Sequence, residues 1–373
     1  YDLPREAVTE AQKAASLRYQ MMDVVDAIRW IPGFGREREL DWLRNMHDWM
    51  ISKKRYWGLA LPIWVCQDPD CGWFTVVGSK EELSARAVAG WEVFEGHSPH
   101  RPYVDAVEVL CEECGGPARR VRDVGNPWLD AGIVSLSTLP ADPADEEAFA
   151  AAKARWFPAD FITESFPGQF RNWFYSLLAM STVLEGQAPF KTVLGFATLF
   201  AEDGREMHKS WGNAIEFNEA ADTMGADVMR WMYLAHRPEQ NLNFGYGPGT
   251  EVRRRFLIPL WNVYGFFVQY ANLAEGWTAP RAWDATRPAG RAPAADEAAR
   301  ELDRWILARQ EAMLAELTER MADYDGFKAT AAVEAFVEEL SNWYVRRSRR
   351  RFWEGEAAAL DTLYTVLVTL SRA

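Results

Sequence analysis

The sequence has few of the features that mark a secreted or membrane-bound protein. Four cysteines in 373 residues are too few for a disulfide scaffold. The first six residues contain no apolar core of a signal peptide. The longest apolar stretch, residues 257–274, is interrupted by Pro259 and Asn262, so it predicts a buried helix and no membrane span. We therefore expect a cytoplasmic protein with no membrane partner.

The chain also lacks an overall positive charge, because its 41 lysines and arginines are outnumbered by 54 acidic residues. A nucleic-acid-binding protein needs positive charge only on its contact surface. The positive charges gather in three short segments, at residues 53–55, 253–255 and 346–351. Each segment is either a patch that contacts phosphates or a solvated helix face.

The four cysteines stand in two close pairs, and a glycine follows each pair. Two tight turns that each carry two thiolates are typical of a structural zinc site. Four thiolates fill the tetrahedron of Zn²⁺ and leave no position for water, so the predicted role is structural. Free cytosolic thiols are the alternative. The predicted zinc ligands are Cys66, Cys71, Cys111 and Cys114.

Hydrophobic periodicity divides the chain into an α/β part and a helical part. The first part has helical spacing over residues 5–30, 39–50, 173–184 and 219–235, and short apolar strands at 60–65, 160–163 and 192–196. This alternation predicts a parallel α/β unit. The second part has long helices with apolar stripes, which predict a helical bundle, over residues 250–275, 298–322, 326–353 and 357–372.

Three polar segments carry candidate binding residues. In residues 51–64, Lys53, Lys54 and Arg55 precede Tyr56 and Trp57. Cations beside aromatic rings can hold a phosphate and stack a base, although the loop could instead pack its rings on the core. A second segment, residues 203–213, presents Lys209 and Ser210, and a mobile lysine can follow a transferring phosphate.

The third segment is the predicted helix over residues 341–353, in which arginines alternate with aromatic residues. Asn342, Arg346, Arg349 and Trp353 fall on one face at helical spacing. Arginines beside aromatic rings suit contacts with RNA phosphates and bases. The predicted RNA contacts are Lys53, Lys54, Arg55, Trp343, Arg346, Arg347, Arg349 and Arg350.

Together these segments resemble class I aminoacyl-tRNA synthetases of the isoleucyl, valyl and leucyl group. The sequence ISKKRYWGLALPIW is similar to the ISRQRYWGxPIP segment of that group, and GREMHKSWGN stands where its KMSKS loop belongs. The sequence SNWYVRRSRRRFW resembles a helix of isoleucyl-tRNA synthetases in particular. The four cysteines resemble a zinc module that some members carry. The resemblance extends over nearly the whole chain.

The resemblance implies ATP-dependent activation of isoleucine to the aminoacyl-adenylate, followed by transfer to tRNA(Ile), with Mg²⁺ beside ATP. It implies a monomeric full-length enzyme. Lys209 and Ser210 would be catalytic, with Lys209 contacting the ATP phosphates. The residues that match the family's adenylate-binding segments are Asp130, Glu164, Gln169, Arg171 and Trp173.

The sequence departs from the family pattern at three places. Pro167 and Gly168 stand where the family's EGxDQ segment has an aspartate. Glu206 and His208 replace the first lysine and first serine of the signature loop. No HxGH motif occurs, and the nearest sequence, at residues 97–100, lacks the glycine. We therefore expect a fragment of a longer ligase, inactive on its own. The alternative is a free-standing, non-catalytic tRNA-binding paralogue.

The predicted fold class is α/β, a partial Rossmann-like catalytic domain with an inserted zinc knuckle, followed by an all-α helical bundle. Residues 1–64 would hold the entry helices and the start of the second catalytic half, and residues 65–122 the zinc knuckle. Residues 123–245 would form the second Rossmann-like half with the KMSKS-like loop. Residues 246–373 would form a C-terminally truncated anticodon-binding domain.

Overall fold

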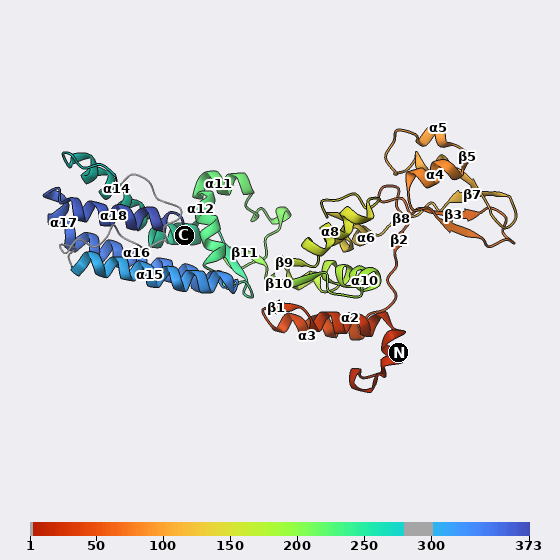
Figure 1. Ribbon diagram of the computed structural model, residues 1–373, viewed down its shortest axis with the longest axis horizontal. Coiled ribbons are helices and arrows are strands. Elements are labelled where there is room, and N and C mark those ends of the chain that lie inside the picture. Colours follow the sequence, from red (N-terminus) through yellow and green to blue (C-terminus); the bar gives the residue numbers. More distant parts are fainter. Residues whose placement is uncertain (1–2, 280–300) are drawn as a thin grey trace. The chain divides into compact units, whose positions relative to one another are not determined.

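The computed structural model describes residues 3–279 and 301–373. The chain divides into two compact units, residues 1–195 and 196–373, and each is described here by itself. The α/β part and the helical C-terminal part that the sequence predicts are both present (Figure 1). Among the described residues, no helix is both long enough and apolar enough to cross a membrane.

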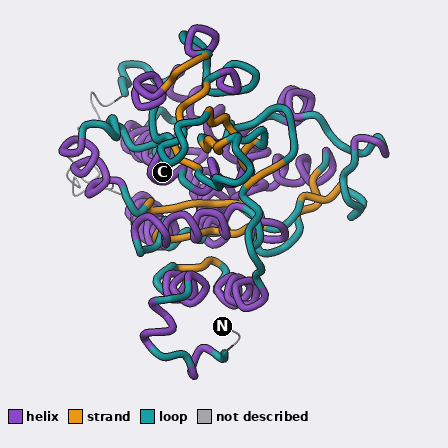
Figure 2. Tube along the Cα trace, turned by 90° about the vertical axis from the view of Figure 1, so that its right-hand side faces the viewer, coloured by secondary structure: helices purple, strands orange, loops and turns teal. Residues whose placement is uncertain are grey.

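The first unit contains a three-stranded sheet in the order β1-β10-β9. The strands are β1 (Arg29–Ile31), β10 (Phe190–Phe196) and β9 (Ala159–Ser165), and β1 runs parallel to β10. Its core holds side chains from the strands and from the helices α2 (Leu17–Asp26), α3 (Phe34–Asn45) and α10 (Trp173–Glu185). Figure 1 labels these helices and strands, and Figure 2 shows helices, in purple, beside strands, in orange. The predicted parallel α/β unit is confirmed.

Two predicted helices have different bounds in the structure. The helix predicted over residues 5–30 is broken into a 3-10 turn (Arg5–Ala7), α1 (Glu10–Ala14) and α2, and its last residues form β1. Trp30 is buried there against Phe166, Phe174 and Phe190. This aromatic contact favours the strand over a further helical turn. The helix predicted over residues 39–50 begins and ends five residues earlier, as α3.

The cysteines lie in a small module built on an antiparallel sheet in the order β4-β3-β7-β6-β5. Its strands are β3 (Ile63–Cys66), β4 (Phe74–Val76), β5 (Ala87–Ala89), β6 (Glu108–Leu110) and β7 (Pro117–Arg120). Two helices, α4 (Lys80–Arg86) and α5 (Trp91–Phe94), and a 3-10 turn (Val104–Ala106) complete it. Trp64, Phe94 and Val107 are in its own core. In a separate two-stranded sheet, β2 (Ser52–Lys53) pairs antiparallel with β8 (Val124–Gly125).

Three helices follow the module in sequence and precede β9, namely α6 (Pro127–Gly132), α7 (Val134–Ser137) and α8 (Glu146–Trp156). A fourth short helix, α9 (Phe166–Gln169), directly follows β9. The side chain of Asn126 caps α6 by accepting a hydrogen bond from the backbone N–H of Trp128 at 3.1 Å. Helix α6 packs against α10. These contacts fix the position of Asp130, which lies on α6.

The second unit begins with β11 (Leu199–Ala201), which pairs parallel with β12 (Leu242–Phe244). A 3-10 turn (Lys209–Trp211), α11 (Phe217–Met224) and α12 (Ala226–Leu234) lie between these strands in sequence. The helices that follow are α13 (Tyr246–Val252), α14 (Ile258–Leu273), α15 (Glu301–Ala322), α16 (Gly326–Glu339), α17 (Arg346–Trp353) and α18 (Ala357–Leu370).

Two π-helical segments, Arg253–Leu257 and Leu340–Val345, join α13 to α14 and α16 to α17. The bundle core includes Ile306, Leu340 and Tyr344, each fully buried. The helical bundle is confirmed, and its helices match the predicted ranges closely. Residues 298–300 of the helix predicted over 298–322 lie outside the described residues.

Candidate active site and metal centre

The four cysteine sulfurs lie within 4.8 Å of one another. The Sγ atoms of Cys66 and Cys114 are 3.5 Å apart, as are those of Cys71 and Cys111. A disulfide requires about 2.05 Å, so these are free thiols. The sulfurs of a tetrahedral Zn–S4 site with bonds of about 2.3 Å are roughly 3.8 Å apart. The observed cluster is therefore close to the arrangement that holds a metal ion.

Local backbone geometry prepares this cluster for charged sulfur. Gly72 and Gly115, which follow the two cysteine pairs, both have φ of 72°, a left-handed conformation that glycine adopts without strain. The backbone N–H of Asp68 donates to Cys66 Sγ at 3.4 Å, and that of Cys114 donates to Cys111 Sγ at 3.5 Å. Such donors stabilise thiolates, the form that binds metal.

The cluster also separates the pKa values of its thiols. Burial raises the pKa of Cys111, but N–H groups of Cys114 and Glu113 and the neighbouring thiols outweigh it and lower this pKa to about 7. For Cys71, a backbone hydrogen bond from Trp73 lowers the pKa, but burial and the other thiols raise it to about 12. One thiolate thus makes the next harder to form. A bound cation would remove this repulsion.

Three of the predicted adenylate-binding residues, Glu164, Gln169 and Trp173, lie in consecutive elements that begin with β9. Glu164 is in this strand, and its Oε1 accepts a hydrogen bond from the backbone N–H of Ser165 at 2.6 Å. Gln169 ends α9, and its Oε1 accepts from the N–H of Trp173 at 3.1 Å. Trp173 Nε1 in turn donates to the carbonyl of Ala131 at 3.0 Å. That last bond ties α10 to the helix that carries the exposed Asp130.

A cavity of about 220 Å³ brings two predicted residues from distant segments together. Lys53 and Arg171 both line it. The other lining residues are Trp42, His47, Asp48, Trp49, Met50, Asn126, Trp128, Asn172 and Tyr175. No sequence motif singles out the segment at residues 47–50, although it lies just before the lysine-rich loop. Two cations beside several aromatic rings make this cavity suitable for an anionic, ring-containing ligand.

The loop that carries Lys209 belongs to the second unit and has its own hydrogen-bond framework. Residue Glu206 forms an antiparallel bridge with Phe200. The Asn213 side chain accepts from the N–H of His208 at 2.9 Å and donates to the carbonyl of Glu206 at 2.9 Å. Lys209 and Ser210 are exposed in the 3-10 turn. Within the described residues, the Lys209 ammonium forms no hydrogen bond or ion pair.

The two residues that depart from the family pattern contact each other. His208 Nε2 lies 3.1 Å from Glu206 Oε2. The imidazole of His208 also packs edge-on against Trp211, with ring centroids 4.2 Å apart. Both Glu206 and His208 are exposed. A carboxylate therefore stands where the family pattern has a lysine, three residues before Lys209.

The basic loop at residues 53–57 remains at the surface. Lys53 is half-buried in β2, whereas Lys54 and Arg55 are exposed. Tyr56 is 60% exposed and Trp57 is 67% exposed. The alternative in which these rings pack on the core is therefore wrong, since both leave most of their surface to solvent.

The arginine-rich helix α17 has an exposed face and one buried arginine, Arg351. Arg346, Arg347, Arg349, Arg350 and Trp353 are exposed, and so is Trp343. The guanidinium of Arg347 lies 4.0 Å from the centroid of the Trp343 ring. Arg350 pairs with Glu354 at 2.7 Å on the surface. Within α17, the exposed arginines offer a cationic face that phosphates can reach.

Two family models match the chain in the order of these features. The model described as tRNA synthetases class I (I, L, M and V) matches residues 10–244. This chain belongs to the class I tRNA synthetases. A second model, described as the anticodon-binding domain of tRNA ligase, matches residues 303–373 of this synthetase chain.

Two curated relatives of the synthetase chain are isoleucine–tRNA ligases. This chain is 41% identical over 352 residues to the isoleucine–tRNA ligase of Thermus thermophilus, a match that covers 92% of this chain and 32% of the relative. It is 37% identical over 366 residues to the isoleucine–tRNA ligase of Methanothermobacter thermautotrophicus. That match covers 96% of this chain and 33% of the relative. The chain thus spans about a third of the length of the curated relatives it matches.

Solved structures support the same fold. The LeuRS of Agrobacterium radiobacter K84, in a ternary complex with tRNA and LeuAMS, matches with a TM-score of 0.63 at 18% identity, over 87% of this chain and 38% of that one. The methionyl-tRNA synthetase of Mycobacterium tuberculosis, in complex with methionyl-adenylate, matches with a TM-score of 0.61 at 16% identity, over 96% and 58%. At these identities the likeness establishes only the fold of the synthetase chain and nothing about its substrate.

Proposed function

We propose that this chain is part of an isoleucine–tRNA ligase, which activates isoleucine with ATP and transfers the aminoacyl group to tRNA(Ile). The observation that carries this proposal is the 41% identity to an isoleucine–tRNA ligase over 92% of the chain. The order of the matched synthetase and anticodon-binding models supports it. In the first step the isoleucine carboxylate attacks the α-phosphorus of ATP, and pyrophosphate leaves. In the second, a terminal hydroxyl of the tRNA attacks the carbonyl of the adenylate, and AMP leaves.

In this proposal Lys209 neutralises charge on the ATP phosphates, together with Mg²⁺. Phosphoryl transfer depends mainly on positioning and charge stabilisation. The Lys209 ammonium is exposed and has no carboxylate partner within the described residues, so it is available to a phosphate. Ser210 follows it in the same turn. The proposed adenylate contacts are Asp130, Glu164, Gln169, Arg171 and Trp173.

For tRNA, the proposed contacts are basic residues of both units together with Trp343. Lys53, Lys54 and Arg55 would contact one part of the tRNA. Trp343, Arg346, Arg347, Arg349 and Arg350 would contact another. The exposed cationic face of α17 supports this role, because phosphate contacts supply most of the affinity for RNA.

The domain division at residues 64, 122 and 245 stays a prediction.

The metal proposed for the cysteine cluster is Zn²⁺, held by Cys66, Cys71, Cys111 and Cys114. Their sulfur spacing and donor set fit zinc, which prefers thiolates in a tetrahedron. When bound, zinc would cross-link the two cysteine turns of the module. All four ligands come from the protein, so the proposed role of zinc is structural.

The test is isoleucine-dependent exchange of pyrophosphate into ATP, measured on the intact enzyme. We expect exchange with isoleucine and much less with valine or leucine. We expect Lys209→Ala to lower the exchange rate by about 10²–10³-fold, the range found when one donor to developing charge is removed. An intact enzyme that catalyses exchange only with another amino acid would overturn the assignment.

The second candidate is a tRNA-binding paralogue without catalytic activity. The observation that favours it is the contact between Glu206 and His208 in the signature loop. Glu206 adds negative charge beside Lys209, which opposes binding of ATP phosphates. This candidate predicts salt-dependent tRNA binding by an intact protein that exchanges no pyrophosphate with any amino acid.

A further inference from the structure

The basic loop at residues 53–57 does not stand alone, because a segment of the cysteine module packs on it. The indole of Trp57 stacks on the imidazole of His100, with ring centroids 4.7 Å apart and an angle of 9° between the planes. The guanidinium of Arg101 lies 4.9 Å from the centroid of the Tyr56 ring. Arg101 Nη1 also donates to the carbonyl of Arg55 at 3.3 Å.

An ion-pair network holds Arg101 in this position. Arg101 Nε donates to Asp105 Oδ2 at 2.7 Å. The other carboxylate oxygen of Asp105 accepts from Nε of Arg120 at 2.7 Å. Arg120 is buried in β7 and also donates to the carbonyls of Leu61 and Asp123. The contact between the module and the loop is therefore anchored in the module's buried framework.

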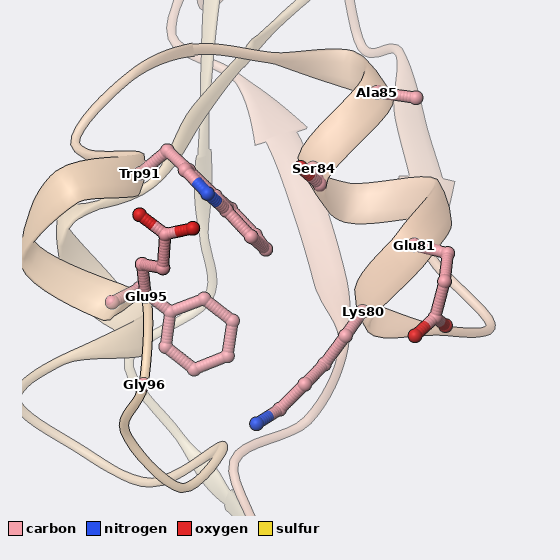
Figure 3. Close-up of a pocket in the computed structure, with 8 residues that line it drawn as sticks. Lys80, Glu81, Ser84, Ala85, Trp91, Glu95 and Gly96 are labelled. Carbon is pink, nitrogen blue, oxygen red and sulfur yellow. The ribbon is translucent and has the colours of Figure 1, made fainter.

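Further contacts order the rest of this segment. The rings of His97 and Tyr103 stack with centroids 3.8 Å apart and an angle of 3°. Nδ1 of His100 lies 3.1 Å from Ser98 Oγ, which orients its ring. Lys80 reaches from α4 past the hollow bordered by Trp91 and Glu95 (Figure 3), and its ammonium donates to the carbonyl of His97 at 2.8 Å.

We propose that residues 54–57 and 97–103 form one composite surface that binds an unpaired segment of tRNA. One face of the Trp57 indole rests on His100, yet the side chain is 67% exposed, so the other face is open to a base. Lys54 and Arg55 are exposed beside it. Stacked rings next to cations bind single-stranded nucleic acid, whereas paired bases present no free face.

This inference rests on the proposed function for the identity of the RNA, and it adds residues of the cysteine module to the tRNA-binding surface. The rings are ordered before binding, so less conformational entropy is lost when a base stacks on them. The module would then act in RNA recognition through residues 97–103, in addition to holding a metal. His100 stacks on Trp57 and positions it, while Trp57 makes the contact with the base.

The experiment measures binding of a fluorescently labelled tRNA transcript with an isoleucine anticodon to the intact protein by fluorescence anisotropy. We expect Trp57→Ala and His100→Ala each to weaken binding by about 5–20-fold, within the range for one stacked base. The matched control is Trp156→Ala. Trp156 is also an exposed tryptophan in contact with an arginine, but it lies on α8. We expect this control to change affinity less than twofold.

Two further measurements identify the kind of contact. We expect Arg55→Ala to reduce the slope of log affinity against log salt by about 0.7–0.9, and Arg119→Ala, an exposed arginine of β7, to leave it unchanged. In competition, a single-stranded RNA of twelve nucleotides should displace the tRNA better than a duplex of the same length. Equal competition by the duplex would overturn the proposal of an unpaired segment.

The outcomes separate this inference from the proposed function. If the wild-type protein binds tRNA and Trp57→Ala and His100→Ala bind it equally well, the composite surface is wrong and the proposed function stands. If the wild-type protein binds no tRNA, both fail. Circular dichroism and metal content of each variant, unchanged from wild type, would attribute a loss of binding to the surface and exclude unfolding of the module.

Discussion

The carboxylate of Asp303, on α15, accepts two hydrogen bonds from the guanidinium of Arg351, on α17, at 2.7 and 2.6 Å. Both side chains are buried, and Tyr344 donates to the same carboxylate at 2.8 Å. Burial lowers the pKa of Arg351, but its bonds to Asp303 and Glu356 outweigh this effect and hold the pKa above its ordinary value. Arg351 therefore holds the bundle together, unlike the exposed arginines of the same helix.

We expect Arg351→Ala to lower the free energy of unfolding by about 3–5 kcal/mol, because it leaves Asp303 buried without its charge partner. Urea unfolding measures this change. The matched control is Arg349→Ala, on the exposed face of the same helix, which we expect to change stability by no more than about 0.5 kcal/mol. Equal effects of the two substitutions would contradict the structural role of Arg351.

Substitutions on the exposed face of α17 should have the opposite effect to Arg351→Ala. They should change tRNA binding and leave stability nearly unchanged. We expect the double variant Arg346→Ala, Arg349→Ala to weaken tRNA binding and to reduce its salt slope by about 1.4–1.8, since each lost phosphate contact removes about 0.7–0.9. Arg309→Ala removes a cation that pairs with Glu339 on the bundle and serves as control. A salt slope unchanged from wild type would exclude these two arginines from the tRNA contact.

Glu39 gives a prediction of pH dependence. It is fully buried on α3, and neither carboxylate oxygen has a hydrogen-bond partner within the described residues. Burial raises the pKa of Glu39 well above its ordinary value. The folded state thus keeps the proton that the unfolded chain releases near pH 4.3, and stability falls as pH rises from that value toward the folded pKa.

We expect Glu39→Gln to be about as stable as wild type near pH 4 and more stable at pH 8. The difference should reach about 1.4 kcal/mol for each unit by which the folded pKa exceeds the unfolded one. Unfolding free energies of both proteins across this pH range test it. A difference that stays constant with pH would show that Glu39 does not titrate on folding.

Loss of the metal should affect the cysteine module selectively. We expect about one zinc per chain in the wild type and almost none in Cys111→Ser, because that variant removes a buried ligand. Hydrogen exchange should then accelerate in the module's strands β3, β6 and β7 and stay unchanged in the bundle helices. Reduced wild-type protein that contains no zinc would contradict a metal site at the four cysteines.

Glu206→Lys should strengthen the signature loop's interaction with ATP. The substitution removes the carboxylate beside His208 and adds a cation three residues before Lys209. We expect the rate of pyrophosphate exchange by the intact enzyme to rise on the order of tenfold, which corresponds to about 1.4 kcal/mol of added stabilisation. A rate equal to or below that of wild type would indicate that Glu206 does not oppose phosphate binding.

Much of the architecture was predictable because it depends on local patterns. Apolar stripes at helical spacing predicted α15 and α18 within a few residues, and predicted as one helix the range 326–353 that α16, a π-helical segment and α17 occupy. The strand β1 was missed, since its three residues pair with a strand more than 150 residues later, and no local pattern records that pairing. Its central residue, Trp30, takes its place in the sheet from aromatic partners that come together only in the folded chain.

Some residues of the candidate site could likewise be predicted from local motifs, and others only from the folded structure. Residue types and their order selected the four cysteines, Lys209 and Glu164, since each lies in a motif with its own chemistry. They did not select His47 or Trp128, whose relevance comes from the cavity they share with Lys53 and Arg171. The sequence singled out residues 97–100 only as an imperfect motif. The contact of these residues with the basic loop could not be predicted from the sequence.

The sequence by itself determined the helical bundle, the paired cysteines with their glycines, and the order of motifs that places the chain among the class I tRNA synthetases. These features depend on spacing along the chain, which the sequence records directly. Only the tertiary structure decided that Arg351 is buried while Arg349 is exposed, and that Trp57 stacks on His100. Burial and stacking arise from contacts between distant segments, and residues of one type become distinct only when those segments pack.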